Sequence, residues 1–581
     1  MHWHSDQLGC QHSYTLMLRD RHLSGKRLFL VFLIIWLVLN VLQAAFTQLD
    51  PDEAYYWMYA RQLDWGYFDH PPGVAVLIKL GSSLFPNELG VRLGVILLQI
   101  GSFYGFWLLL GKPKEYAQVL TLIILLAAMP MLQIFGFVAT PDAPLLFCGV
   151  WFFYFYQKFL EKESWANTVL LGICMAALLY SKYHGILLIF FTLFSNLSLL
   201  LRPKFYIAAV FGALLFFPHL YWQYAHEFPS VRYHLVERED PFEWKHPITY
   251  VLNQFVIFNP FIFPMALFAL LRQTNKGKMY RAYLVLIFCC WAFFLYFSFK
   301  GHAEPQWTAL LTIPFVVLTW QYAVADAHFV FNAWIRRLGL LSIALFFVAR
   351  LALLQWNIFG LTTNFHRTAW VFELQKVAQG LPVVFQNSYR DPSVYTFYTK
   401  AQAYTFTDAY YRKNQFDIWD WEKDLQNQGV LLAGQKNWTC SDCEQVRFAK
   451  KDFTLKWVDS LQVASKVWMS YHSDFVWQPG ALVEIPLEIR NPYPYAIELS
   501  QGNMPLSFKA LFYKEEEIAY TARLRFSTPL TRLPAHQVIR TTATFSVPES
   551  LQGWYYFALG IQTGDLPPAF NSKLTKVTIN H

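Results

Sequence analysis

The chain has 581 residues, of which 55% are hydrophobic and 19% aromatic, whereas only 15% are charged. A soluble chain of this length carries about 25% charged residues, so the composition excludes an ordinary multi-domain soluble protein and indicates a membrane protein with a substantial water-exposed part. The net charge is +8, but in a membrane protein the basic residues first have to be assigned to one side of the bilayer or the other. We therefore expect no nucleic-acid partner. Seven cysteines are too few for a disulfide framework.

Residues 26–355 contain about eleven apolar stretches that are long enough to cross ~30 Å of hydrocarbon. The sequence therefore predicts a polytopic α-helical membrane protein, preceded by a cytoplasmic tail at 1–25. A further apolar segment, 73–86, is short and indicates an amphipathic or re-entrant piece. The predicted spans are 27–47, 90–110, 116–136, 143–159, 165–181, 184–201, 205–223, 247–271, 281–299, 307–324 and 336–355.

The charges on the connecting loops predict the orientation. With the N-terminus inside, sixteen basic residues fall in the inner segments and six in the outer loops, which is a strong positive-inside bias. Acidic residues show the opposite bias. An odd number of spans then places everything after about residue 356 on the outer side, so the polar face of the protein is predicted to be extracytoplasmic.

The region after residue 356 has the alternating pattern of a water-exposed domain. Strand-like runs such as 403–406 and helix-like runs such as 394–398 predict an α/β domain over 356–452. Short strands recur from there on and predict a β-sandwich of immunoglobulin-like type over 453–581. Cys440 and Cys443 favour a short-loop disulfide, with a metal or redox role as the weaker alternative.

The first outer loop concentrates carboxylates at the mouth of the helix bundle. Asp50, Asp52 and Glu53 lie within four residues, and an aromatic-rich stretch follows that ends in Asp69-His70-Pro71-Pro72. The simple alternative is an acidic loop in which Asp50 or Asp52 caps a helix over 53–62.

Further ionisable residues occupy the other outer loops. Ionisable groups near membrane depth are costly, so they are candidates for a functional site. Snorkelling anchors are the alternative for Lys182 and Lys300. The residues concerned are Asp142 in Thr-Pro-Asp-Ala-Pro, Lys182 and Tyr183 in Ser-Lys-Tyr, Arg232 and Arg238 in the long fourth loop, and Lys300, His302 and Glu304 in the fifth.

Taken together and in this order, these motifs resemble the bacterial protein-mannosyltransferase-like family, which includes the aminoarabinose transferases. The resemblance covers about residues 25–355. It implies a GT-C membrane glycosyltransferase domain at 26–355 in the bacterial inner membrane, with an extracytoplasmic C-terminal region. It also implies transfer of a sugar from a polyprenyl-phosphate-linked donor to a hydroxyl of a glycolipid such as lipid A, a polysaccharide or a protein.

The resemblance assigns roles to the outer-loop residues. Asp52 is the expected general base, which takes the proton of the attacking acceptor hydroxyl in an inverting transfer. Glu53 orients the acceptor or the loop, and Asp142 binds sugar or acceptor as a second carboxylate. The leaving lipid phosphate requires cations. The expected substrate-binding residues are Asp69, His70, Lys182, Tyr183, Arg232, Arg238, Lys300 and Glu304.

Two features of the site are left open by the sequence. Some relatives have a lysine where this chain has His70, which makes a phosphate-binding role at this position pH-dependent. Asp69, His70, His302 and Glu304 could alternatively hold a divalent metal, and no other cofactor is expected. No GxGxxG or P-loop motif is present, which fits a lipid-linked rather than a nucleotide-linked donor.

A secondary transporter with an extracytoplasmic domain is the alternative function. Asn253, Gln254, Asn259 and Pro260 in the eighth predicted span favour it, because polar residues and prolines interrupt spans at transport sites. The clustering of polar residues in outer loops argues against it. A binding or assembly protein is a third alternative, but it leaves the acids of the first loop without a purpose.

Overall fold

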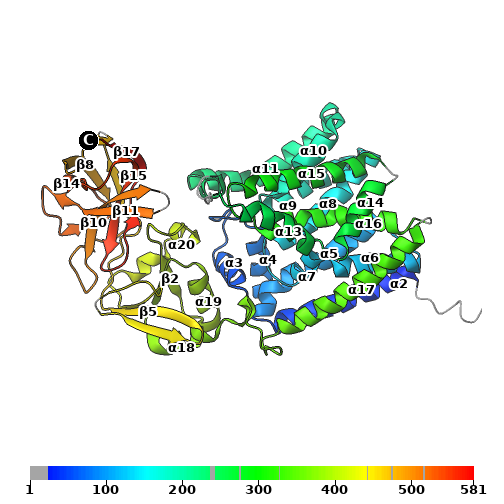
Figure 1. The fold of residues 1–581 in the computed structure, drawn as a ribbon, viewed down its shortest axis with the longest axis horizontal. Coiled ribbons are helices and arrows are strands. Elements are labelled where there is room, and N and C mark those ends of the chain that lie inside the picture. The colour runs from blue at the N-terminus through cyan, green and yellow to red at the C-terminus, as the bar shows by residue number, and fades with distance from the viewer. Residues whose placement is uncertain are drawn as a thin grey trace, which may run out of the picture. The chain divides into compact units, whose positions relative to one another are not determined.

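The computed structural model describes residues 24–235, 242–273, 276–325, 328–440, 442–472, 475–514 and 517–580. The chain forms two compact units, Met1–His366 and Arg367–His581, of which the first is helical and the second consists mainly of strands (Figure 1). The predicted N-terminal tail lies outside the described residues except for its last two positions, and Arg238 lies outside them as well.

Four helices of the first unit are both long and apolar enough to cross a membrane, namely α2, α5, α11 and α15. The other helices are shorter, more polar or broken, so the number of eleven spans stays a prediction. The helices are α2 (Gly25–Ala45), α3 (Pro51–Arg61), α4 (Gly73–Ser82), α5 (Glu88–Leu109), α6 (Tyr116–Ala128), α7 (Pro130–Ile134), α8 (Asp142–Glu161), α9 (Trp165–Ser181), α10 (Gly185–Ser195), α11 (Pro203–Ala225), α12 (Pro229–Leu235), α13 (Lys245–Ile257), α14 (Phe263–Arg272), α15 (Lys278–Ser298), α16 (Thr312–Ala323) and α17 (Phe329–Ala352), with 3-10 turns η1 (Leu197–Leu201) and η2 (Pro305–Leu311).

Two predicted spans each divide into two α-helices, and two others, 184–201 and 307–324, each combine an α-helix with a 3-10 helix. The stretch 116–136 forms α6 and α7, because Pro130 has no N–H to continue α6 and instead starts α7. The stretch 247–271 forms α13 and α14, with Asn259 between them in a left-handed conformation. The buried Asn259 amide donates to the carbonyl of Ala128, the last residue of α6, at 2.8 Å. The side chain at the second break therefore supplies a hydrogen bond to a backbone carbonyl at the first break.

The short apolar segment at 73–86 forms helix α4, which packs closely on α5. A Cβ atom at Gly81 would lie 2.1 Å from the carbonyl oxygen of Gly90, so glycine is required for this approach. Val74, Ala75 and Ile78 are fully buried in the contact. The segment therefore belongs to the helix bundle.

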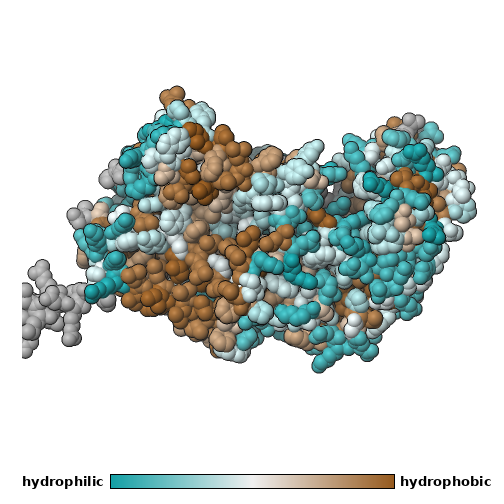
Figure 2. Space-filling model, turned by 180° about the vertical axis from the view of Figure 1, so that it is seen from behind, coloured by the Kyte–Doolittle hydropathy of each residue, from teal (hydrophilic) through white to brown (hydrophobic). Residues whose placement is uncertain are grey.

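The surface of the first unit is strongly apolar. Large hydrophobic side chains such as Ile34 on α2, Leu214 on α11 and Leu345 on α17 are exposed, and apolar residues cover much of the face shown in Figure 2. Hydrocarbon chains solvate such a surface, and water does not. The exposed apolar surface therefore supports embedding of this unit in a bilayer.

The second unit begins with a five-stranded sheet in the order β2-β1-β3-β5-β4. β1, β2 and β3 are parallel, and β5 and β4 form an antiparallel hairpin. The predicted domain border at 452/453 falls inside β5, because the hairpin folds back onto this sheet. The elements are α18 (Ala369–Ala378), β1 (Val383–Gln386), α19 (Arg390–Thr399), β2 (Ala403–Phe406), α20 (Gln415–Ile418), η5 (Trp421–Leu425), β3 (Val430–Gly434), β4 (Glu444–Phe448) and β5 (Lys451–Val458).

Most of the remaining strands form a six-stranded sheet, ordered β11-β10-β15-β17-β7 with β16 beside β15, and a four-stranded sheet, ordered β12-β14-β8-β6. Alternate residues of β8 are buried, as expected for a sheet with one face on a core. The immunoglobulin type stays a prediction. The strands are β6 (Trp468–Tyr471), β7 (Val476–Trp477), β8 (Leu482–Arg490), β10 (Leu506–Lys514), β11 (Glu517–Arg523), β12 (Arg525–Phe526), β14 (Val538–Ser546), β15 (Gly553–Thr563), β16 (Ala569–Phe570) and β17 (Thr575–Ile579), besides the short pair β9 (Ile497–Glu498) and β13 (Arg532–Leu533).

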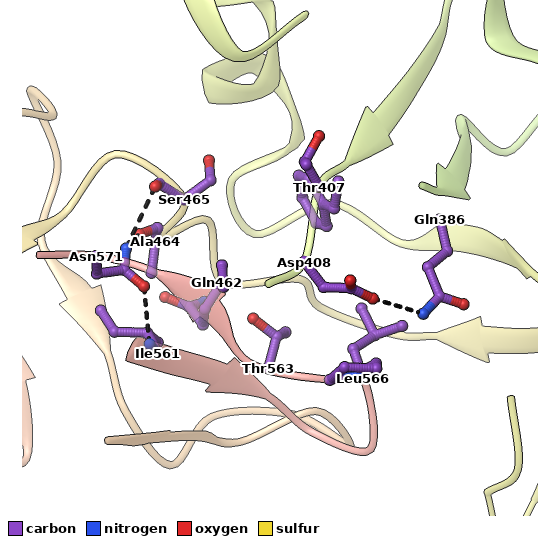
Figure 3. Close-up of a pocket in the computed structure, with 13 residues that line it drawn as sticks. Gln386, Thr407, Asp408, Gln462, Ala464, Ser465, Ile561, Thr563, Leu566 and Asn571 are labelled. Atoms are coloured by element: carbon purple, nitrogen blue, oxygen red, sulfur yellow. Dashed lines mark hydrogen bonds between the residues drawn. The ribbon is translucent and has the colours of Figure 1, made fainter. Parts of the chain in front are cut away.

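The five-, six- and four-stranded sheets share one core, which runs from Val384 to Ile579. A crevice lined by residues of β1, β2, β15 and β16 and of connecting segments lies in this unit (Figure 3). In it, Asp408 accepts a hydrogen bond from Gln386 at 2.9 Å, and Asn571 donates to backbone carbonyls, including that of Ser465. Asp408 thus links the segment after β2 to β1, and Asn571 links the segment after β16 to the one before β6. Cys440 and Cys443 form the disulfide that their spacing favoured.

Candidate active site

Helix α3 carries the acids of the first outer loop. Asp50 is its N-cap: the Asp50 carboxylate accepts from the N–H of Asp52 at 2.9 Å, and the Glu53 carboxylate accepts from the N–H of Asp50 at 3.0 Å. The capping alternative is therefore correct for Asp50, although the helix starts at Pro51, two residues before the predicted start. Asp52 lies in the first turn with a half-buried side chain.

Glu53 points into the protein and pairs with Arg92 of α5. Nε of Arg92 lies 2.8 Å from Oε1 of Glu53, Nη2 contacts the second oxygen, and both side chains are fully buried. The same carboxylate accepts from the N–H of Ala139 at 2.8 Å, so it ties the first outer loop to the second. Arg92 also donates to the carbonyls of Ala44, Thr47 and Gln48.

Sequence reasoning missed Arg92. The signal was present, because Arg92 is an ionisable residue inside the predicted span 90–110, where such residues are rare. Of the roles expected for Glu53, its contacts support orientation of the loop.

Asp142 and Lys182 meet although they come from different outer loops. Asp142 begins α8, and Lys182 follows the last residue of α9. The Lys182 ammonium lies 2.8 and 2.9 Å from the two carboxylate oxygens, and the two side chains are 7% and 5% exposed. Lys182 is thus buried in the protein rather than extended toward the lipid headgroups, so the anchor alternative is wrong for this residue.

Asp69 is held by the aromatic residues of the first loop. The Tyr59 hydroxyl donates to Asp69 at 2.6 Å, and the Tyr59 ring stacks on Tyr67 with ring centroids 4.0 Å apart. Burial, reinforced by the charge of Asp69, raises the pKa of Tyr59 well above its ordinary value, so the hydroxyl stays a donor. His70 lies with its ring edge against Tyr56, at 5.5 Å between ring centroids.

Tyr183 connects the third outer loop to α11 and α12. Its hydroxyl donates to Ser230 at 2.8 Å and accepts from Gln223 at 2.9 Å, and Nε2 of His219 lies at 3.1 Å. Ser230 in turn donates to the carbonyl of Tyr67. Burial raises the pKa of Tyr183, which keeps its hydroxyl protonated. This network fixes the third loop beside the first.

The other predicted residues lie at the surface. Arg232 is 3.3 Å from Glu227, and both side chains are mostly exposed. Lys300 is exposed, with its ammonium 5.9 Å from the ring centroid of Tyr296. His302 and Glu304 approach each other to 4.0 Å. The side chains of these residues are partly or largely exposed, whereas Asp142, Lys182 and Asp69 are buried.

A metal site formed by Asp69, His70, His302 and Glu304 stays a prediction. The ligand-type group found among the described residues is Cys440, Asp442 and Asp565 in the second unit. That group does not suit a metal, because Cys440 is in the disulfide and the Lys456 ammonium lies 2.7 Å from both Asp442 and Asp565.

One known protein family matches the part of the chain that carries several of these residues. The family model of dolichyl-phosphate-mannose-protein mannosyltransferases matches residues 69–222, which include Asp69, His70, Asp142, Lys182 and Tyr183. The similarity to this family therefore covers the part of the chain that carries these residues. The resemblance that the motifs predicted is thereby confirmed. A comparison with curated protein sequences gives no match.

Solved structures share the fold of this chain. ArnT from Cupriavidus metallidurans in the apo state is similar with a TM-score of 0.56 and 13% identity, over 73% of this chain and 97% of ArnT. The structure of ArnT bound to undecaprenyl phosphate has the same TM-score and coverage at 14% identity. The predicted fold class is confirmed: a GT-C-type membrane protein with a β-rich C-terminal region. Over residues 69–222 the chain is similar to dolichyl-phosphate-mannose-protein mannosyltransferases.

Proposed function

We propose that the protein transfers a hexosyl or pentosyl group from a polyprenyl-phosphate-linked donor to a hydroxyl of a glycolipid, a polysaccharide or a protein. The reaction takes place at the outer side of the bacterial inner membrane. The family match and the GT-C fold support the reaction class. ArnT has been solved with undecaprenyl phosphate bound, which supports a donor of the same chemical class here.

The observation that carries the proposal is the placement of Asp52. Asp50 is used as the cap of α3, and Glu53 is paired with Arg92 in the interior. Asp52 has its backbone fixed by the cap and its side chain half-buried in the first turn of the helix. A carboxylate held in a fixed position is what a general base requires.

The reaction then follows as a single displacement. Asp52 takes the proton of the acceptor hydroxyl while the hydroxyl oxygen attacks the anomeric carbon. The bond from that carbon to the phosphate oxygen breaks, and the lipid phosphate leaves with the electron pair. Attack opposite to the leaving group inverts the anomeric configuration. Cations at the membrane surface, of which Arg232 and Lys300 are the accessible ones among the described candidates, stabilise the phosphate.

The pair of Asp142 and Lys182 supplies the second part of the site. Its two charges neutralise each other inside the protein, so the pair presents hydrogen-bonding groups with little net charge. Such a pair suits the hydroxyls of a sugar, with Asp142 accepting and Lys182 donating. We therefore assign sugar or acceptor binding to the pair rather than phosphate binding to Lys182 alone.

Substitution of the base tests the proposal. We expect Asp52→Asn to lower the transfer rate by about 10²–10⁴-fold, because the amide cannot take the proton. Asp64→Asn is the matched control, since Asp64 lies exposed in the same loop and its carboxylate only accepts from the N–H of Trp65. The control should transfer at the native rate.

Mass spectrometry of envelope glycolipids and glycoproteins provides the measurement. A deletion strain should lack a sugar mass that the wild-type gene and Asp64→Asn restore and Asp52→Asn does not. The missing mass identifies sugar and acceptor together. Full restoration by Asp52→Asn, at equal protein level, would refute the base assignment, and a deletion strain that loses solute uptake but no glycan would favour the transporter.

A further inference from the structure

Arg350 of α17 is a buried cation without a carboxylate partner among the described residues. It is 5% exposed. Its Nε donates to Oε1 of Gln133 at 2.8 Å, and its Nη2 donates to Oδ1 of Asn40 at 2.9 Å and to the carbonyl of Gln133 at 3.0 Å. All of these acceptors are neutral.

This arrangement is costly and is therefore informative. An ionisable side chain inside a membrane-embedded unit has to be desolvated, and Arg92 offsets this cost by pairing with Glu53. Among the described residues, Arg350 has neutral amides and carbonyls and the rings of Trp36 and Phe137 to offset it, but no carboxylate. A neutral side chain of similar volume would pack at lower cost, so folding alone does not account for an arginine at this position.

The contacts of Arg350 converge on the chain segment that leads to Asp142. We call residues 133–139 the Phe137 segment. Gln133 starts it and is bound by Arg350 through both its side chain and its carbonyl. The guanidinium carbon of Arg350 lies 4.9 Å from the ring centroid of Phe137, and that of Arg92 lies 5.9 Å from the same ring.

The far end of the segment is fixed from the other side. The N–H of Ala139 donates to Glu53, which is held by Arg92. The two arginines come from α5 and α17, so the Phe137 segment is set by two helices that are distant in the sequence. Three residues after this segment the chain reaches Asp142, which pairs with Lys182.

We propose that Arg350 is a positioning residue that sets the Phe137 segment and, through it, the Asp142–Lys182 pair. The inference rests on the proposed function, in which that pair binds sugar or acceptor. The planar fork of the guanidinium reaches Gln133 and Asn40 simultaneously, which a lysine ammonium cannot reproduce. The role is therefore specific to arginine rather than to positive charge.

Kinetics of the full-length protein provide the first test. Arg350→Met and Arg350→Lys should each lower kcat by about 10- to 100-fold, because a displacement of about 1 Å at the reacting groups costs up to ~10²-fold. KM for the donor should change less than about threefold, because Arg350 contacts the Phe137 segment and is not expected to contact the donor itself. Arg337→Met is the control: Arg337 is exposed on the same helix, with its guanidinium 5.6 Å from the Trp334 ring. It should leave kcat unchanged.

A second test measures the accessibility of a residue next to the Phe137 segment and does not depend on sugar transfer. Thr140 lies between Ala139 and Asp142 and is half-buried. In purified Thr140→Cys protein, the rate of alkylation by a maleimide should rise several-fold when Arg350→Met is added, and should not rise with Arg337→Met. The same protein without Thr140→Cys corrects for labelling of Cys289, which is also half-buried. A structural role elsewhere in α17 would not change this rate.

The two tests separate the inference from the proposed function. If the wild type transfers no sugar but the labelling rate rises, the proposed function is wrong and the positioning of the segment stands. If labelling and kcat are both native in Arg350→Met, the inference is overturned. If Arg350→Met does not accumulate, Gln133→Asn shortens the acceptor by one methylene and should give the same rise in labelling, with a native rate again overturning the inference.

Discussion

At the scale of single residues, the three carboxylates of the first outer loop have different environments although they lie within four residues. Asp50 bonds the backbone, Asp52 is half-buried at the loop surface, and Glu53 is buried against Arg92. Chemical role follows environment, because a carboxylate in an internal ion pair cannot take a proton from an acceptor hydroxyl. Proximity in sequence therefore does not make these residues equivalent.

The buried pair gives a prediction for stability. Arg92→Met leaves the Glu53 carboxylate buried without its partner, so we expect a loss of about 3–5 kcal/mol of unfolding free energy. The double variant Glu53→Gln, Arg92→Met should recover part of this loss. Thermal unfolding of purified protein measures both.

Arg232→Met is the matched control for this experiment. The pair of Arg232 with Glu227 is 61% and 80% exposed, so its removal should cost no more than about 1 kcal/mol. If Arg92→Met and Arg232→Met lowered the unfolding temperature equally, the Glu53–Arg92 pair would not be the internal anchor that the structure indicates.

At the scale of the element, helix α3 depends on its capping box, which also fixes the backbone of Asp52. Asp50→Ala removes the cap and should cost about 0.5–2 kcal/mol, with the first turn frayed and transfer reduced several-fold. Asp50→Ser restores a capping oxygen and should recover most of the rate. Transfer assays on both variants check this. Equal rates for Ala and Ser would show that the cap does not position Asp52.

At the scale of the whole molecule, the charge distribution predicts that the second unit is extracytoplasmic, because basic residues remain on the cytoplasmic side. Protease added to intact spheroplasts should therefore digest Arg367–His581. A tag on the N-terminus should survive until the membrane is broken, which controls for leakage. If the second unit were protected in intact spheroplasts, the predicted orientation would be wrong, and the outer-side reaction with it.

The sequence predicted those features that depend on neighbouring residues. Hydropathy located most of the apolar helices, alternation located strands such as β8 (Leu482–Arg490), and the acids of the first loop predicted a cap at Asp50 or Asp52, which the structure places at Asp50. Hydropathy failed where an apolar stretch hides a break: 116–136 is mostly apolar, yet Pro130 divides it. A hydropathy average over many residues hides a single proline. The helix backbone is nevertheless interrupted there, because proline has no N–H to donate.

Only the tertiary structure decided which charges meet. Glu53 and Arg92 are 39 residues apart, Asp142 and Lys182 are 40 apart, and Gln133 and Arg350 are 217 apart. Each ionisable residue is visible in the sequence as an expensive group near or within the membrane. Its partner is set by how the helices pack, and no local pattern encodes that packing. The sequence by itself therefore determined the membrane embedding and the kinds of residue at the site, and the packing of helices determined which of them hold the site in place.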